Sequence, residues 1–384
     1  MKSKDVVWLF LFCRLILLVT LPLEGLRGFG DLLHFYRLAG MGLPMIDYWV
    51  EFPPVFPYLS MVLFSFAGGK EHIYDYLLVI LLSLAQAGGL AALIRLARGL
   101  NIESGAVQRI TWVYFGVTLV LPYGWWYFDA LGVLALLLGL VWLVEQKDVR
   151  AGIALATGVL VKFFPLMVLP MIWRWSSRRR AVLVTCIIVG ITAVVYAGFL
   201  IRAPEMTLAS LRSQGEKGSW ETVWALVDGN FSTGNFGSEE ERYDPATASL
   251  GRGNPSRLPA WLTLIPFAVL GLWLFWRSRL ESPRGAIAFL GLTWCIFLLW
   301  SPGYSPQWVL YLLPLILVCL PVRTANLFTI TLVVVNVLEW PVMLSRGYNW
   351  GLWLTILIRA LLLGLLALEF WNEANRSRLA TEVH

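Results

Sequence analysis

The feature that most constrains this chain is a succession of apolar runs, several of them long enough to cross a lipid bilayer. A membrane-spanning helix needs about 20 mainly apolar residues. Of the 384 residues 58% are hydrophobic and only 14% are charged, whereas soluble proteins carry about 25% charged residues. No water-soluble core can hide this excess, so we predict an all-α polytopic membrane protein. The runs cover residues 6–23, 74–96, 110–121, 130–144, 151–161, 164–173, 181–201, 258–276, 286–300, 308–320, 327–344 and 352–370.

Basic residues predict the orientation of the chain, because Lys and Arg accumulate in cytoplasmic loops. The strongest basic loop is 174–180, which we place in the cytoplasm. Further basic segments should lie on the same side of the membrane. They are residues 2–4, 95–109, 147–150, 277–284, 323 and 376–378.

About twelve crossings, with both termini in the cytoplasm, satisfy this orientation under two conditions. The segment 53–66 must stay outside as a surface or half-inserted helix. The segment 151–173 must be a hairpin broken near Pro165, since proline interrupts helices. We therefore expect one transmembrane domain that includes the whole chain, with large outward loops at residues 24–73 and 202–257.

The first outward loop contains the most informative polar residues. Asp31, His34 and Arg37 would share one helix face if residues 31–39 are helical. A carboxylate at a membrane surface can act as a general base toward a hydroxyl group, and its pKa rises where lipid and aromatic side chains exclude water. Ordinary loop polarity, with Asp31 as a helix N-cap, explains the same pattern.

Polar residues at the ends of spans form a second set of candidates. Lys162 separates two apolar runs, and a lysine at this depth is costly unless it snorkels to the surface or meets an anion such as a phosphate. Asp129 opens a helix, either as a charge that suits the helix dipole or as support for an outward cavity. Tyr304 and Gln307 stand at a helix start, where they can donate to a phosphate or sugar or serve the turn itself.

Four polar residues, Arg14, Asn336, Glu339 and Arg359, lie in or near the spans. Such groups are functional candidates by default. Equally, Arg14 and Arg359 can be interhelical partners of Glu339 or of backbone carbonyl groups. The sequence leaves both interpretations open.

The sequence contains no motif for binding a metal ion or a nucleotide. The four cysteines lie inside apolar runs, and with three histidines the chain shows no metal-ligand spacing. It also lacks a Walker-type loop and a GxGxxG loop. We therefore expect no metal, no cofactor and no direct use of nucleotides. Residues 229–254 are rich in Gly, Ser, Glu and Asn, and we expect them to be mobile.

Four segments, taken in order, resemble the polyprenol-phosphate-sugar-dependent glycosyltransferases of the GT-C fold, in particular family 87 and its mannosyltransferase relatives. The segments are GDLLHFYRLAGMGLPMIDYWVEFPPVFPYL, WWYFDALGVL, AGIALATGVLVKFFPLMVLP and SPGYSPQWVLYLLPLI. The resemblance covers most of residues 1–320, and its specificity lies in the order and spacing of the motifs together. The chain departs from the family at Tyr127 and Phe128, where the family has Gly-Gln, and at Phe52, where the family has Tyr.

This resemblance implies roles for the residues above. Asp31 matches the catalytic aspartate of the family and would deprotonate an acceptor hydroxyl. Lys162 would stabilise the charge of a leaving phosphate. The residues implied to help it bind the donor are Arg37, His34, Tyr304 and Gln307. The residues implied to bind the substrates are Asp47, Glu51, Asp129 and Glu221.

The implied reaction is an inverting transfer of a sugar, with mannose as the expected one, from a polyprenyl phosphate to a hydroxyl of a lipid or glycan acceptor. The expected partners are the lipid-linked donor, the acceptor and the bilayer, with no nucleic acid. The expected location is the bacterial cytoplasmic membrane, with the active site outside and a role in the cell envelope. A secondary transporter or lipid flippase is the alternative, because it also has about twelve helices and intramembrane charges, although no internal repeat is visible.

Overall fold

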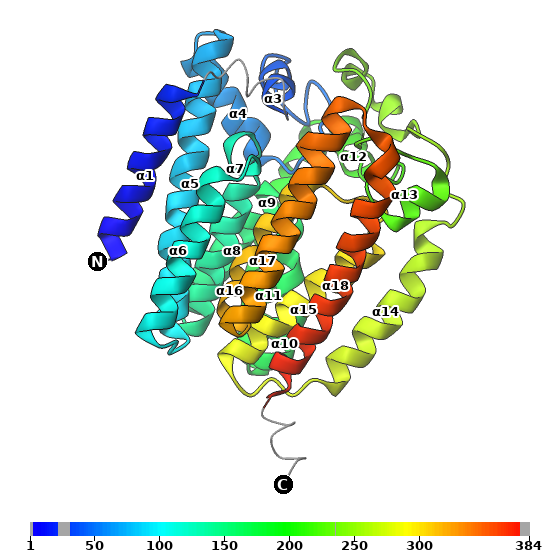
Figure 1. The fold of residues 1–384 in the computed structure, drawn as a ribbon. Helices are drawn as coiled ribbons and strands as arrows, with labels where there is room; N and C mark the ends of the chain where they lie inside the picture. The colour runs from blue at the N-terminus through cyan, green and yellow to red at the C-terminus, as the bar shows by residue number, and fades with distance from the viewer. Residues whose placement is uncertain (1–2, 22–30, 235, 377–384) are drawn as a thin grey trace.

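The computed structural model describes residues 3–21, 31–234 and 236–376, arranged as a bundle of helices (Figure 1). The structure is 77% helical and these residues form no β-strand, which confirms the all-α prediction. Six segments are each long and apolar enough to cross a membrane. They are α5 (Glu71–Gly99), α11 (Arg178–Arg202), α14 (Ala260–Arg277), α15 (Pro283–Trp300), Val322–Arg346, which begins with α17 (Val322–Val337), and Asn349–Ala374, which ends with α18 (Leu352–Ala374).

The remaining predicted apolar runs form helices that do not meet both the length and the composition of a span. They are α1 (Ser3–Thr20), α6 (Ser104–Val120), α8 (Asp129–Val144), α9 (Asp148–Val161), α10 (Val168–Trp175) and α16 (Val309–Cys319). Taken singly, α8 and α9 have 16 and 14 residues, fewer than the about 20 of a typical span. By length and composition the structure therefore supports six spans, and twelve crossings stay a prediction.

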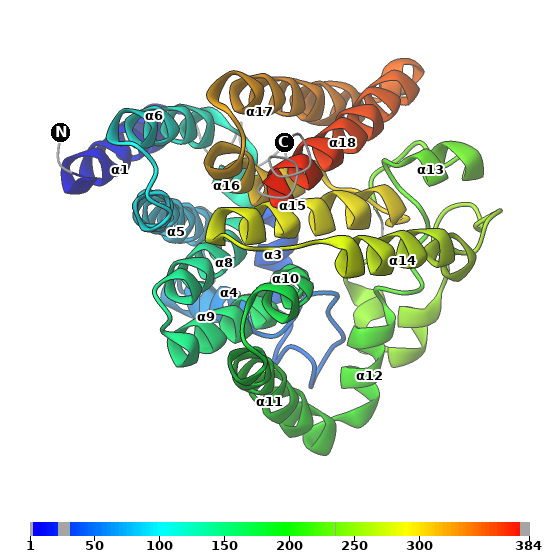
Figure 2. The same cartoon turned by 90° about the horizontal axis from the view of Figure 1, so that it is seen from below.

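The outer helices leave their apolar side chains uncovered. Only 11% of the apolar window of α14 and 17% of that of α11 is buried, against 67% for α5. Ile201 and Trp276 are 86% and 72% exposed, and Figure 2 shows α14 on the rim of the bundle beside α15. Exposed apolar surface on this scale is unfavourable in water and suits lipid. The chain is an integral membrane protein.

The chain reverses direction between α9 and α10, as the proline at position 165 predicts. α9 ends at Val161, Lys162 is extended, and a 3-10 helix, η1 (Phe164–Met167), leads into α10. Arg180, at the start of α11, donates hydrogen bonds of 2.8–3.0 Å to Asp148, at the start of α9. The segment between them has therefore left that end of the bundle and returned, which places Lys162 near the opposite end.

The two ends of the bundle differ in their charged contacts. The end that receives the C-terminal part of α18 carries ion pairs from the predicted basic loops (the lower end in Figure 1). They join Arg95 and Lys147 to Glu145, Arg180 to Asp148, and Arg284 to Glu373.

The two large predicted loops share the opposite end (Figure 1). The first contributes α3 (Leu32–Ala39) and α4 (Val55–Phe66), and the second contributes α12 (Pro204–Arg212) and α13 (Val223–Asp228). Residues 24–30 of the first predicted loop lie outside the described residues.

Candidate active site

Asp31 stands immediately before α3 and is not used as a helix cap. The helix is amphipathic: Leu32, Phe35 and Leu38 are buried on one face, which turns His34 to the other. The Asp31 side chain makes no capping hydrogen bond and is partly exposed. The capping interpretation of Asp31 is therefore wrong, and its carboxyl group is available for other contacts.

Charged neighbours surround the Asp31 carboxyl group. Burial has the largest effect and raises its pKa above the ordinary value of 3.8. In decreasing order, the charge of His34 lowers the pKa, that of Glu51 raises it, and those of Lys217 and Lys162 lower it. Groups that act on one another in this way lie within a few side-chain lengths. Asp31 and Lys162, from segments far apart in the sequence, thus share one end of the bundle.

Lys162 and Asp129 form an ion pair. The Lys162 Nζ lies 2.7 Å from Asp129 Oδ1 at the start of α8. The Lys162 side chain is 15% exposed and that of Asp129 is 1% exposed. The aromatic rings of Phe128 and Phe164 lie 5.1 and 5.3 Å from the ammonium group. The Asp129 carboxylate is therefore buried, and the Lys162 ammonium is the more exposed group of the pair.

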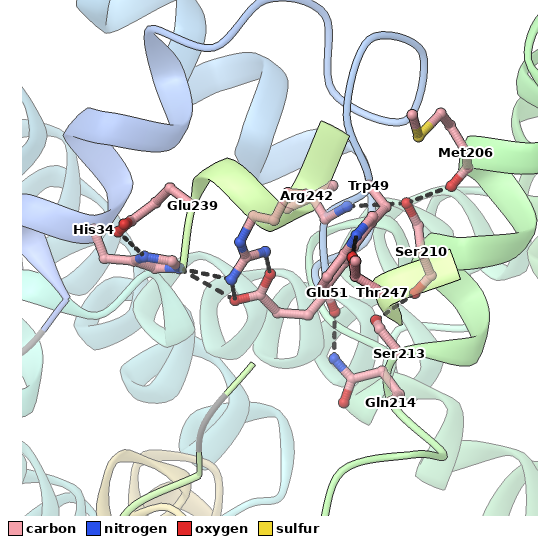
Figure 3. A network of polar contacts seen from close by, with 11 residues as sticks. His34, Trp49, Glu51, Met206, Ser210, Ser213, Gln214, Glu239, Arg242 and Thr247 are labelled. Atoms are coloured by element: carbon pink, nitrogen blue, oxygen red, sulfur yellow. Dashed lines mark hydrogen bonds and ion pairs between the residues drawn. The ribbon is translucent and has the colours of Figure 1, made fainter. Parts of the chain in front are cut away.

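His34 and Glu51 belong to a network that joins the first outward loop to the second (Figure 3). The two ring nitrogens of His34 lie 3.1 Å from Glu239 Oε1 and 3.2 Å from Glu51 Oε1. Arg242, which is 1% exposed, donates two hydrogen bonds to Glu51, which is 3% exposed. Two carboxylates facing one imidazole favour its protonated form.

The pKa values of this network follow from the same contacts. Burial alone lowers the pKa of His34, but the hydrogen bond and charge of Glu51 raise it above the ordinary 6.5 overall. Burial alone raises the pKa of Glu51, but Arg242 and His34 hold it far below the ordinary 4.5. At neutral pH Glu51 is therefore a buried anion held by the Arg242 guanidinium and the His34 ring.

Residues 236–254, within the loop expected to be mobile, are held by buried contacts. The Trp49 amide donates to the Arg242 carbonyl at 3.0 Å, and the Trp49 indole donates to Thr247 Oγ1 at 3.0 Å. These contacts tie the segment to the first outward loop, because Arg242 inserts a charge that Glu51 neutralises.

We expect the contacts that anchor residues 236–254 to the first outward loop to weaken at alkaline pH. His34 has a raised folded pKa, so its contribution to stability is complete below 6.5 and is lost as the pH rises through the folded value. Glu51 has a lowered pKa, so its contribution is present above 4.5 and is lost only in acid. Limited proteolysis of this segment should speed up as the pH rises above 6.5.

The variant His34→Asn isolates this effect. It removes the imidazole, so cleavage of residues 236–254 should become faster in mild acid and nearly independent of pH on the alkaline side. An alkaline increase of the same size in His34→Asn would assign the pH dependence to another group.

Residues 217–222 pack against the predicted motif at 301–308. The Trp220 amide donates to the Pro302 carbonyl at 3.2 Å, and the Tyr304 amide donates to the Trp220 carbonyl at 3.0 Å. The Trp220 indole donates to Ser305 Oγ at 3.3 Å. Two segments about 80 residues apart therefore form one rigid unit.

Tyr304 and Glu221 belong to a buried polar group in the bundle interior. The Tyr304 hydroxyl donates to Asn336 Oδ1 at 2.9 Å, and the Arg359 guanidinium lies 3.8 Å above the Tyr304 ring. Arg359 pairs with Glu339 and donates to the Glu221 carbonyl. Burial, followed by the charge of Glu339, raises the pKa of the Glu221 carboxyl group well above its usual value. The interhelical pairing of Arg359 with Glu339 is confirmed.

A small recess, with about 20 Å³ of free space, lies next to this polar group among α13, α15 and α18. Its walls are mainly aliphatic, and Thr222, Tyr304 and Arg359 supply the polar part. The aliphatic residues that line it are Val223, Leu298, Leu299, Ile356, Ala360 and Leu363.

The other predicted site residues lie at the periphery or within the packing. Arg37 is more than half exposed and lies 3.7 Å from Glu239. Asp47 is exposed and accepts a 2.7 Å hydrogen bond from the Leu43 amide, which fixes a turn. Gln307 is 9% exposed in η4 (Pro306–Trp308), ahead of α16. The site thus brings together Asp31, His34, Glu51, Asp129 and Lys162.

Lys217 is a member of this group that the sequence patterns did not indicate. Its ammonium lies 4.0 Å from the Trp220 ring centroid and 3.9 Å from that of Phe236. Burial lowers the pKa of Lys217 to about 8, against smaller upward effects of Glu51, Asp31 and Glu221. The one available signal was its position four residues before Glu221, which the resemblance implied to bind substrate. Arg242 and Glu239 gave no signal because they lie in the loop expected to be mobile.

No protein-family model, no curated protein and no solved structure matches this chain. Over residues 3–21, 31–234 and 236–376, no group of three or more His, Cys, Asp or Glu side chains is arranged to hold a metal ion. The geometry of the site is therefore the basis for assigning a function.

Proposed function

We propose that this protein is a glycosyltransferase that moves a sugar, with mannose as the first candidate, from a polyprenyl phosphate to an acceptor hydroxyl. The observation that carries the proposal is the setting of Asp31, a partly exposed carboxyl group with a raised pKa, within electrostatic reach of Lys162 and Lys217. A base beside cations at one end of a membrane bundle suits a reaction that takes a proton from a hydroxyl and releases a phosphate. The resemblance to GT-C family 87 supports the same reaction.

In the proposed step, the acceptor oxygen forms a bond to the anomeric carbon while the bond from that carbon to the phosphate oxygen breaks. The acceptor proton passes to Asp31, and the bonding electron pair leaves with the polyprenyl phosphate. Attack from the face opposite the phosphate inverts the anomeric centre. The raised pKa of Asp31 makes it a stronger base than an exposed aspartate once it is ionised.

The proposed topology has about twelve crossings, with the Asp31 end outside the bacterial cytoplasmic membrane. The basic ion pairs at the opposite end support this orientation. The shorter helices are compatible with it, because irregular backbone at membrane depth is tolerated where protein covers it. The break at Lys162 meets that condition, since Phe164 and Pro165 after it are buried.

A direct assay tests the proposal. The purified protein is incubated with polyprenyl-phosphate [14C]mannose and a membrane extract that contains acceptors. Appearance of labelled mannose in a new lipid or glycan supports the transferase. Ion-coupled flux or lipid translocation in vesicles without any product would favour the transporter or flippase.

Lys162 should matter for use of the donor. We expect Lys162→Ala to lower kcat/KM for the donor by about 10²–10³-fold, the usual loss when a group that stabilises transition-state charge is removed. Lys162→Arg keeps a cation and should retain part of the activity. The KM for the acceptor should change little, which initial-rate kinetics with both substrates varied would show.

The ion pair with Asp129 requires a control, because Lys162→Ala leaves a buried carboxylate without its partner. The double variant Lys162→Ala with Asp129→Asn removes that charge. It should regain thermal stability without regaining donor use. Recovery of activity in the double variant would show that Lys162 acts only by neutralising Asp129.

A further inference from the structure

Lys217 lacks the carboxylate partner that Lys162 and Arg242, at the same end of the bundle, possess. Lys162 is paired with Asp129, and Arg242 with Glu51. Among the residues that the structure describes, no carboxylate lies within ion-pair distance of the Lys217 ammonium, whose nearest partners are the rings of Trp220 and Phe236. An ammonium group that has lost much of its water without gaining an anion is left with unused capacity to bind one.

The two rings hold this ammonium group in a defined place. Trp220 is fixed by its backbone bonds to the 302–304 segment and by its indole bond to Ser305. Gly234 closes the space on another side: a Cβ atom there would lie 2.2 Å from Lys217 Cε and 2.3 Å from Nζ. The cation is therefore positioned before any ligand arrives, which lowers the entropic cost of binding.

Lys217 belongs to the group of charged residues around Asp31, the proposed general base. Its charge acts on Asp31, and the charges of Asp31, Glu51, Glu221 and Lys162 act on it. Glu51 is already neutralised by Arg242 and His34. Aromatic contacts also connect the two lysines. The Trp220 ring, beside Lys217, lies 6.3 Å from the Trp308 ring between centroids, and the Lys162 ammonium lies 5.9 Å from the Trp308 ring centroid.

We propose that Lys217 and Lys162 form a two-lysine site for a phosphate anion beside Asp31, with Lys217 as the main cation. This rests on the function proposed above and deepens it, because the anion is the phosphate of the lipid-linked donor. Lys162 contributes a charge anchored by Asp129, while Lys217 contributes one that forms no ion pair with any described residue. A free phosphate ion has the same chemistry, so the two sources must be separated by experiment.

Competitive labelling of amines tests this site without any transfer reaction. The purified full-length protein is treated near neutral pH with a limiting amount of an acylating reagent, and each lysine is quantified by mass spectrometry. Because its pKa is about 8 rather than 10.5, Lys217 should react faster than the exposed Lys70. Separate samples contain polyprenyl phosphate, inorganic phosphate or the uncharged polyprenol.

We expect polyprenyl phosphate to protect Lys217 by about tenfold or more and to leave Lys70 unprotected. Protection by polyprenyl phosphate alone identifies a lipid-linked ligand, and protection by inorganic phosphate as well identifies a site for phosphate in general. Equal protection by polyprenol would show simple covering by lipid and would overturn the proposal, as would no protection by either phosphate.

Binding of tritiated polyprenyl phosphate gives a second measure. Lys217→Met should raise the dissociation constant by about tenfold or more, and Lys217→Arg should largely restore it. Gly234→Ala changes no charge but displaces the ammonium group, so it should also weaken binding. Lys70→Met is the matched control and should bind normally. If Lys217 is protected but no sugar is transferred, the transferase proposal fails while the anion site stands.

Discussion

Asp31→Asn should lower sugar transfer by about 10²–10⁴-fold, the range typical for loss of a general base. Asparagine keeps the shape of the side chain but cannot accept the acceptor proton. The fold should not suffer. Burial raises the pKa of Asp31 above 3.8, so its ionisation at neutral pH costs folding free energy that the neutral amide does not. Loss of activity with equal or higher thermal stability is therefore the expected signature.

Two measurements make this result specific. Glu216→Gln removes an exposed carboxylate from the same end of the bundle and should leave transfer unchanged. In the wild type, kcat/KM should fall as the pH drops through a value above 3.8, because Asp31 must be ionised to act. A substantial rate in Asp31→Asn, with the same acid limb, would assign the base to another group.

Arg242→Met should destabilise the protein strongly, costing about 3–5 kcal/mol of folding free energy. It leaves the Glu51 carboxylate, which is 3% exposed, without its main partner. The damage should concentrate at residues 236–254, because Arg242 anchors this segment to the first outward loop. Thermal unfolding in detergent and limited proteolysis measure the two effects.

The double variant Arg242→Met with Glu51→Gln tests the cause. If the loss comes from an unpaired buried charge, removing that charge should recover most of the stability. Arg257→Met, a change of the same type at an exposed position of the second outward loop, should have little effect. No recovery in the double variant would show that Arg242 stabilises through packing against Trp49, which lies 4.7 Å from it.

Much of the helical framework follows from short-range information. A run of apolar residues is helical and lies in the membrane wherever it is placed, because its backbone must satisfy its own hydrogen bonds there. The predicted run 181–201 thus reappears as α11, and Pro165 marks the reversal between α9 and α10. Predicted residues 31–39 likewise differ by one position from α3.

The candidate site was predicted less completely. Asp31 and Lys162 stand out in the sequence because charge is scarce near apolar runs. Asp47 was also predicted as a site residue because it is a charged residue near apolar runs, yet it only fixes a surface turn. Arg242 was not predicted because it lies in a polar, Gly-rich loop, yet it is almost fully buried. Composition records how polar a segment is, not which partner its charges will meet.

By itself the sequence determined that this protein is helical and embedded in a membrane, and it singled out Asp31 and Lys162. Only the tertiary structure decided which charges are neutralised. Lys162 meets Asp129 across 33 positions and Arg242 meets Glu51 across 191, whereas Lys217 meets aromatic rings alone among the described residues. These outcomes depend on long-range packing, because an ion pair needs its two groups within a few ångströms of each other in space.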